Sequence, residues 1–233
     1  MSRGVGAVDA IQTTLPDWVA LVAALVTQLG DAWFLAVLFV SLLVTQREQR
    51  RDILSVMGLL AVAVGLYRTL KHLFGRARPN EQWLDPEPLP SAVEPLYEGA
   101  AHATGYGFPS GHATSVTVAY IGLAVVLTLG TRRQRFGVAG AVVALVSVSR
   151  VALGVHYLVD VVAGIALGAG VLALGLRASG PRFSLGQVFG GAVAASLCYL
   201  VASGGHIESV LLLCATVGLL VGWRYRGVTA RPP

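Results

Sequence analysis

The sequence predicts an all-α membrane protein, a polytopic bundle of about six to seven transmembrane helices preceded by an N-terminal interfacial helix. Three observations lead to this fold class. Of the 233 residues, 55% are hydrophobic and only 12% are charged, about half the charged share of a soluble protein. Several apolar runs approach or exceed the roughly 17–20 residues that cross a bilayer as a helix. No polar stretch is long enough to fold separately, so we expect a single helical domain.

The first 30 residues are expected to form an N-terminal interfacial segment. Residues 15–29 are apolar but short, and Asp17 and the Gly30–Asp31 pair interrupt the apolar pattern. A short helix of this kind suits the boundary between headgroups and acyl chains. We therefore expect residues 15–29 to lie flat in the interface, with a short spanning hairpin as the alternative.

Seven apolar runs follow as candidates for spanning helices, at about 31–46, 52–73, 113–130, 135–154, 157–177, 185–203 and 207–223. Residues 75–111 are rich in proline, glycine and acidic side chains and predict an extramembrane loop. We assign residues 31–177 to a core that contains this loop, and residues 178–233 to additional C-terminal transmembrane helices and a cytoplasmic tail. Cys198 and Cys214 lie inside apolar runs, so we expect neither a disulfide framework nor a cysteine metal site.

Arginine clusters in alternate short connections predict the orientation of the bundle. The clusters are Arg47, Arg50 and Arg51; Arg132, Arg133 and Arg135; Arg177 and Arg182; and Arg224, Arg226 and Arg231. Cytoplasmic connections of membrane proteins carry an excess of lysine and arginine, so these connections are expected in the cytoplasm of a protein of the plasma membrane. Because they explain eleven of the seventeen basic residues, the pI near 9.6 reflects orientation and we expect no nucleic-acid partner.

The other basic residues need a second explanation, since all but Arg3 lie near the opposite face. They are Arg3, Arg68, Lys71, Arg76, Arg78 and Arg150. Three polar clusters contain the five outward cations or lie beside them, at residues 71–79, 107–112 and 149–160. The deduced topology puts all three clusters at outward helix ends on one side of the bilayer. Arg68 and Arg76 suit cations that extend from a helix end to the interface.

His156 and Asp160 are the first candidate catalytic pair. We expect a helix that begins near Val155 or His156, so that residues four apart share a face and the carboxylate bonds one imidazole nitrogen. The other nitrogen is then left as a base or a nucleophile. An isolated pair of this kind is commonly a structural contact, but ionisable residues in a membrane segment are costly and tend to mark function.

The segment from Pro109 to His112 predicts an anion site. Gly111 allows the backbone to approach a ligand closely, and Ser110 with the following N–H groups can open a helix, whose N-terminus attracts anions. His112 would stand at the mouth of that site. The structural alternative is a serine N-cap with an incidental histidine.

Together the clusters point to phosphate. Lys71, Arg78 and Arg150 supply three cations, and guanidinium groups match phosphate oxygens in pairs. No cluster of metal ligands accompanies them. The sequence therefore predicts a phosphoryl-transfer site that needs neither metal nor other cofactor, in which fixed cations stabilise the developing charge. The residues alone leave open which of the two histidines attacks.

These residues resemble the type-2 phosphatidic-acid phosphatase superfamily, membrane lipid phosphatases that share a core with soluble acid phosphatases and vanadium haloperoxidases. The family motifs K-x6-R-P, P-S-G-H and S-R-x5-H-x3-D are filled by Lys71 to Pro79, Pro109 to His112 and Ser149 to Asp160, in that order. The resemblance covers about residues 31–177 and implies a histidine-phosphatase-type core there. The apolar runs over residues 185–223 depart from the family pattern.

The resemblance implies a role for each motif residue. His156 would be the nucleophile that forms a phosphohistidine, Asp160 would orient it, and His112 would protonate the leaving oxygen. The residues implied to bind the phosphoryl oxygens are Lys71, Arg78, Ser110, the Gly111 backbone N–H and Arg150.

The expected activity is hydrolysis of a lipid phosphate at a site that faces the extracytoplasmic side. Phosphatidic acid, phosphatidylglycerol phosphate and a polyprenyl diphosphate are all compatible substrates, and the lipid and the bilayer are the expected partners. The alternatives are a lipid phosphotransferase with the same motifs, a vanadium-dependent haloperoxidase, and a transporter or non-catalytic lipid-binding protein on the same scaffold.

Overall fold

The structure is a computed structural model that describes residues 6–79, 81–85, 89–91, 93–179 and 184–229, and within those ranges every regular element is a helix. The all-α membrane fold is thereby confirmed. The helices are α1 (Ala7–Thr14), α2 (Trp18–Thr27), α3 (Ala32–Thr45), α4 (Arg50–Phe74), α5 (Glu94–Ala101), α6 (Gly111–Val116), α7 (Gly122–Val126), α8 (Arg132–Ala152), α9 (Leu158–Ser179), α10 (Leu185–Ala202) and α11 (Ile207–Thr229).

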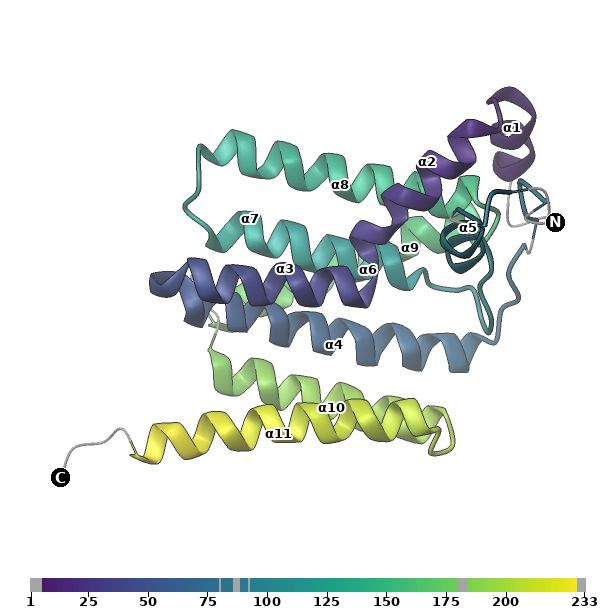
Figure 1. Cartoon of the computed structure of the whole chain (residues 1–233). Helices are drawn as coiled ribbons and strands as arrows, with labels where there is room; N and C mark the ends of the chain where they lie inside the picture. Colours follow the sequence, from purple (N-terminus) through teal and green to yellow (C-terminus); the bar gives the residue numbers. More distant parts are fainter. Residues whose placement is uncertain (1–5, 80, 86–88, 92, 180–183, 230–233) are drawn as a thin grey trace.

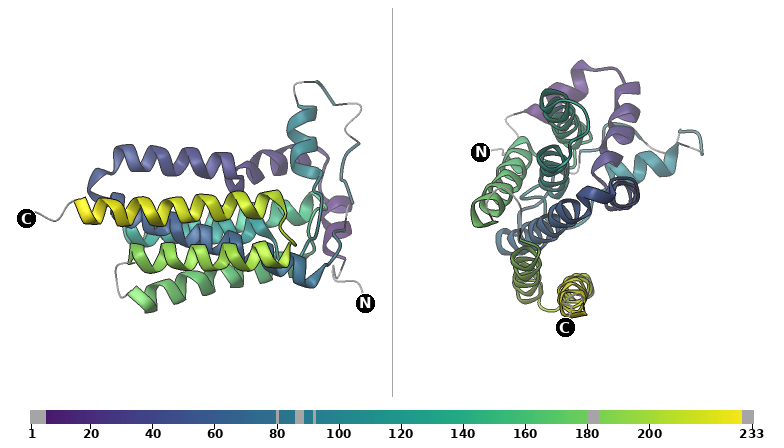
Figure 2. Two further views of the ribbon diagram at one scale, coloured as in Figure 1. Left: turned by 90° about the horizontal axis from the view of Figure 1, so that it is seen from below. Right: turned by 90° about the vertical axis from the view of Figure 1, so that its left-hand side faces the viewer.

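The long helices run side by side, and the short helices α1 and α5 lie at one end of the bundle (Figure 1). At that end lie α1, α5 and the described part of the loop 75–111; we call it the loop end. The C-terminal end of α11 lies at the opposite end (Figures 1 and 2). The arginine clusters that begin α4 and α8 and the arginines late in α9 and α11 belong to that opposite end.

Five helices of the described chain are long and apolar enough to span a membrane: α4, α8, α9, α10 and α11. A sixth span arises if α2 and α3 count as one, because the pair qualifies together although it bends by 51° at its junction. The stretch Gly111–Val126, which joins α6 to α7 through a π-helical turn, is apolar but shorter than a full span. The runs at 31–46 and 113–130 therefore form shorter helices than expected.

Local signals explain where these helices stop. The α4 helix ends at Gly75, whose φ of 55° is readily adopted by glycine, and the Gly75 N–H donates to Lys71 O at 3.0 Å. The capping box of Thr131 and Gln134 starts α8. Because α7 already ends at Val126, the last four residues of the run expected at 113–130 fall in the connection instead of a helix.

Glycines allow α4 and α9 to pack closely against their neighbours. A Cβ atom at Gly65 of α4 would lie 2.7 Å from the Ala195 carbonyl carbon of α10, so only glycine allows this approach. On α9, a Cβ atom at Gly164 would lie 2.6 Å from Ser110 O, at the start of α6. The second contact holds the α6 N-terminus, and with it the second motif, against α9.

Two helices lie outside the predicted elements and cover the loop end. The α5 helix belongs to the loop 75–111, and its Tyr97 and Ala100 pack with Ala20 and Ala24 of α2 and with Leu153. The α1 helix precedes α2 and lies at the same end (Figure 1). Because α2 bends away from α3 as half of a broken span or of a re-entrant turn, the interfacial placement of residues 15–29 stays a prediction.

Candidate active site

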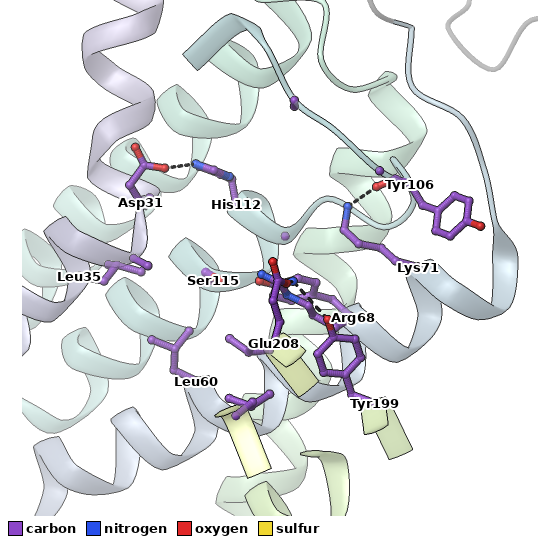
Figure 3. Close-up of a pocket in the computed structure, with 18 of the residues that line it drawn as sticks. Asp31, Leu35, Leu60, Arg68, Lys71, Tyr106, His112, Ser115, Tyr199 and Glu208 are labelled. Atoms are coloured by element: carbon purple, nitrogen blue, oxygen red, sulfur yellow. Dashed lines mark hydrogen bonds and ion pairs between the residues drawn. The ribbon is translucent and has the colours of Figure 1, made fainter. Parts of the chain in front are cut away.

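A cavity of about 980 Å³ lies at the loop end and extends between the helices. Six of the eight predicted site residues line it: Lys71, Arg78, Gly111, His112, Arg150 and His156. The other two, Ser110 and Asp160, are fully buried and bond to each other through the Ser110 N–H and Asp160 O at 2.8 Å. The fold thus brings the three separate motifs together. Figure 3 shows Lys71 and His112 at this cavity.

The side chain of His156 lies between a carboxylate and a guanidinium. Its Nδ1 is 3.4 Å from Asp160 Oδ2 and its Nε2 is 3.0 Å from Arg78 Nη1. A guanidinium only donates hydrogen bonds, so Nε2 accepts and the ring proton sits on Nδ1, facing Asp160. His156 lies in the turn before α9, which begins only at Leu158. The expected helix start near residue 155 is therefore wrong, although Asp160 still reaches the ring.

Burial, reinforced by the positive charges of Arg78, Arg150 and Lys71, holds the pKa of His156 well below its usual 6.5. Only 2% of the residue is exposed. The free imidazole is thus neutral at pH 7, and the lone pair of Nε2 points at the guanidinium of Arg78. That arrangement is what a nucleophilic histidine requires.

Backbone carbonyl groups position the cations of the first motif. Arg78 donates from Nε to Gly105 O of the loop at 3.2 Å and from Nη1 to Val155 O, in the turn between α8 and α9, at 2.9 Å. Lys71 donates from Nζ to Tyr106 O of the loop at 2.5 Å. These carbonyls therefore fix both cations at the cavity wall without neutralising their charge.

Arg150 is a cation buried within the bundle, with 4% of its surface exposed. Its Nη1 donates to Thr27 Oγ1 at 3.0 Å and to Ala100 O at 3.1 Å. Its Nε has no hydrogen-bond partner among the residues that the structure describes. A buried charge is costly unless it is paired, so an anion in the cavity would supply the missing partner.

The second motif forms the start of α6. Ser110 Oγ accepts a long 3.4 Å bond from Ala113 N, so the serine is the N-cap that the structural alternative described. Its side chain is buried and is not among the residues that line the cavity, so its contact with phosphate stays a prediction. A Cβ atom at Gly111 would lie 2.9 Å from the Tyr67 ring. Glycine at this position therefore lets the first turn of the helix border the cavity.

The structure adds a partner for His112 that sequence reasoning missed. His112 Nε2 lies 2.8 Å from Asp31 Oδ1, and both residues line the cavity (Figure 3). Asp31 stands at the bend between α2 and α3, and a Cβ atom at Gly30 would lie 2.9 Å from His112 Cδ2. The Gly30–Asp31 pair, interpreted above as an interruption of an apolar run, thus receives the His112 ring. An aspartate inside an apolar run was the signal from which a partner for His112 could have been sought.

The cavity has an apolar arm that extends along α3 and α4. Its lining residues there are Leu35, Ala36 and Phe39 of α3 and Met57, Leu60, Ala61 and Val64 of α4. Among the polar side chains outside the motifs that also line the cavity are Arg68 of α4, Tyr199 of α10 and Glu208 of α11. A polar end and an apolar arm in one cavity match an amphipathic ligand. No three His, Cys, Asp or Glu side chains of the described chain are grouped to hold a metal ion.

Comparison with known proteins gives a family match and two curated relatives. The model of the PAP2 superfamily matches residues 52–184, more than half of the chain. The chain is 33% identical over 82 residues to phosphatidylglycerophosphatase B of Bacillus subtilis strain 168, covering 33% of this chain and 40% of the relative. It is 32% identical over 149 residues to undecaprenyl-diphosphatase of Sulfolobus acidocaldarius, covering 63% of this chain and 65% of the relative.

Two solved structures share the fold. LpxE of Aquifex aeolicus matches with a TM-score of 0.53 at 21% identity, over 76% of this chain and 96% of its own. The first transmembrane PAP2 type phosphatidylglycerolphosphate phosphatase from Bacillus subtilis matches with a TM-score of 0.59 at 25% identity, over 76% and 86%. The likeness to LpxE, at 21% identity, concerns the fold alone.

Proposed function

Because the chain belongs to the PAP2 superfamily, we propose that it is an integral membrane phosphatase that hydrolyses a phosphomonoester or diphosphate of a lipid through a phosphohistidine intermediate. The observation that carries this proposal is that residues of all three motifs line one cavity. Three cations and two histidines from all three motifs line its polar end, and its other arm is apolar. The names of the curated relatives, one a phosphatidylglycerophosphatase and one an undecaprenyl-diphosphatase, support a lipid phosphate as substrate.

In the first proposed step, Lys71, Arg78 and Arg150 hold the phosphoryl oxygens. His156 Nε2 attacks the phosphorus, an N–P bond forms, and the bond from phosphorus to the lipid oxygen breaks. The leaving oxygen takes a proton from His112. Asp160 accepts from Nδ1–H and stabilises the positive charge that the ring acquires.

In the second step, a water molecule attacks the phosphohistidine. His112 accepts the water proton, the N–P bond breaks, and inorganic phosphate is released from the neutral His156 ring. The Gly111 N–H faces the phosphate from the start of α6, with the Ser110 cap behind it, where backbone donors and the helix dipole favour an anion. No metal takes part in the proposed cycle.

The test is phosphate release by purified protein in detergent with EDTA present, using phosphatidic acid, phosphatidylglycerol phosphate and a polyprenyl diphosphate. We expect activity in EDTA, a radiolabelled acid-labile phosphoenzyme, and loss of both in His156→Ala. Thr45→Ala, at an exposed position at the end of α3 and outside the cavity lining, serves as the control. Full activity in His156→Ala, or a requirement for Mg²⁺, would refute the mechanism. Transfer of phosphate to an added acceptor lipid instead of water would identify a phosphotransferase.

We place the protein in the plasma membrane with the loop end on the extracytoplasmic side, with residues 1–30 as the interfacial segment, 31–177 as the phosphatase core and 178–233 as the added C-terminal part. The arginine clusters at the opposite end support this orientation. After Cys198 and Cys214 are replaced by serine, Glu94→Cys should react with an impermeant maleimide in intact cells. Glu48→Cys, at the opposite end, should react only after lysis. The reverse pattern would invert the orientation.

A further inference from the structure

One group of polar side chains in the cavity lies outside the three motifs. Arg68 Nη1 donates to Tyr199 OH at 3.3 Å and forms an ion pair with Glu208 Oε2 (Figure 3). Tyr199 belongs to α10 and Glu208 to α11, and both helices follow residue 184, where the family match ends. The C-terminal hairpin therefore contributes to the cavity wall although it is not part of the family core.

The order of residues along α4 places Arg68 between the phosphate site and the apolar arm. Arg68 precedes Lys71 by three residues, so both point from one face, with Arg68 about 5 Å further from the loop end. The same face continues away from the loop end with Val64, Ala61, Leu60 and Met57, all of which line the cavity. From the loop end inward the wall thus presents a phosphate-site cation, a second cation and then apolar side chains.

A lipid that carries two phosphates has the same order of groups. Its terminal phosphate is the one that hydrolysis removes, the second phosphate follows on the lipid side, and the tail comes last. With the terminal phosphate beside Lys71 and the tail in the apolar arm, the second phosphate falls at the level of Arg68. Guanidinium groups bind phosphate oxygens with paired N–H donors.

Arg68 has donors free for such a ligand. Among the described residues both hydrogen bonds of its guanidinium use Nη1, and the group also lies over the Tyr199 ring. Nε and Nη2 are left available as donors. The side chains of Arg68 and Glu208 are 37% and 57% exposed, so the pair is open to the cavity. The hairpin does not depend on this ion pair alone, because α10 packs directly on Gly58 and Gly65 of α4.

We propose that Arg68, positioned at the cavity wall by Tyr199 and Glu208, binds the second phosphate of a lipid substrate that carries two phosphates. The inference rests on the proposed function and makes Arg68 a specificity-determining residue for it. In the empty site Glu208 holds the guanidinium; the second phosphate then takes over that role. Two sources fit this chemistry, the phosphodiester of a glycerol-linked headgroup and the lipid-linked phosphate of a polyprenyl diphosphate.

Two variants break the same ion pair from opposite sides, and only one of them removes the cation. For Arg68→Gln we expect the ratio of kcat/KM for a two-phosphate lipid over phosphatidic acid to fall about ten- to a hundredfold, the range of a lost charged hydrogen bond. Glu208→Gln should keep or raise that ratio. A fall confined to phosphatidylglycerol phosphate identifies the phosphodiester as the ligand, and one confined to the polyprenyl diphosphate identifies the diphosphate.

The inference is wrong if Arg68→Gln leaves both ratios unchanged, or if Glu208→Gln lowers them as much, because the pair would then act only by holding the hairpin. Arg76→Gln is the matched control: the guanidinium of Arg76 lies over the Phe74 and Phe108 rings, and it does not line the cavity. We expect this variant to keep the wild-type ratios.

Binding separates this inference from the proposed function. The same three lipids are titrated against His156→Ala protein with and without Arg68→Gln, so that the dissociation constants need no turnover. Absence of phosphate release by the wild type would contradict the proposed function. The dissociation constants still decide on Arg68. A rise with Arg68→Gln in the Kd of a two-phosphate lipid relative to that of phosphatidic acid supports the second-phosphate site, and an unchanged Kd ratio refutes it.

Discussion

The two ends of the cavity are built in opposite ways. At the phosphate end, Arg150, His156 and Asp160 are almost completely buried, and short turns, backbone carbonyls and glycines hold them in place. At the lipid end, Arg68 and Glu208 are partly exposed and α11 has most of its side chains exposed. A buried, fully positioned wall suits chemistry, because its dipoles need no reorganisation during the reaction. An open wall of helices suits selection among lipids.

The largest expected effect comes from the buried end. Asp160→Asn removes the acceptor that keeps the His156 proton on Nδ1, and an asparagine can present its NH₂ group there instead. The ring would then offer the wrong nitrogen to phosphorus. We expect kcat to fall by about 10³–10⁴-fold, the size of the effect in related histidine–carboxylate systems.

Phosphate release and thermal unfolding in detergent measure this prediction. Asp52→Asn, an equivalent change at the far end of α4, should match the wild type in both. Near-normal kcat in folded Asp160→Asn protein would show that the 3.4 Å contact between the carboxylate and the ring has no part in orienting His156.

The next largest effect concerns the contact between Asp31 and His112 at the cavity wall. Asp31→Asn removes the charge beside His112 and weakens the contact that positions the ring. A general acid contributes about 10²–10⁴-fold, so we expect a partial loss of about ten- to a hundredfold with lipid substrates. With p-nitrophenyl phosphate, whose leaving group needs no proton, the loss should nearly disappear.

The dependence on the leaving group separates positioning from damage to the fold. Asp17→Asn, an exposed aspartate just before α2, is the control and should leave both substrates unaffected. An equal loss with lipid and with p-nitrophenyl phosphate would assign Asp31 a structural role at the bend between α2 and α3.

The sequence predicts the phosphate end of the cavity better than the lipid end. The buried end was predictable because its chemistry lies in short local spacings, such as the four residues from His156 to Asp160. The open end was not, since Arg68 meets Glu208, 140 positions later, only after α10 packs on α4 and α11 folds back along α10. Asp31 was missed for the same reason: its partner His112 belongs to another helix.

The fold shows a similar limit. Apolar length predicts the long helices well because a bilayer requires it. It does not predict the bend between α2 and α3, where packing of His112 against Gly30 decides the path of the chain. It also gives no signal for α1 and α5, which are short and polar and whose stability comes from tertiary contacts.

A smaller effect is expected from filling the apolar arm. Leu60→Trp narrows the arm on α4 and should displace the last carbons of a long acyl chain. Loss of about two buried methylenes at roughly 0.8 kcal/mol each corresponds to about a tenfold rise in KM. A short-chain or water-soluble phosphate ester should be turned over as by the wild type.

Leu73→Trp makes the same change on α4 outside this cavity, and it should not alter KM for either chain length. If Leu60→Trp raised KM equally for long and short chains, the arm would not be the site of the lipid tail. The two ends of the cavity would then not divide chemistry from lipid selection.

The smallest effect concerns the charge of His156. Because burial lowers the pKa of His156 well below 6.5, the ring should keep its neutral NMR shifts as the pH falls through 6.5. The unfolded chain binds a proton there and the folded one does not, so this residue lowers the free energy of unfolding by up to about 1.4 kcal/mol per pH unit below 6.5. His156→Gln should remove that part of the acid sensitivity, and the His156 resonances are assigned by their absence from its spectrum. Titration of His156 at or above pH 6.5 would contradict the buried, uncharged nucleophile on which the phosphate end depends.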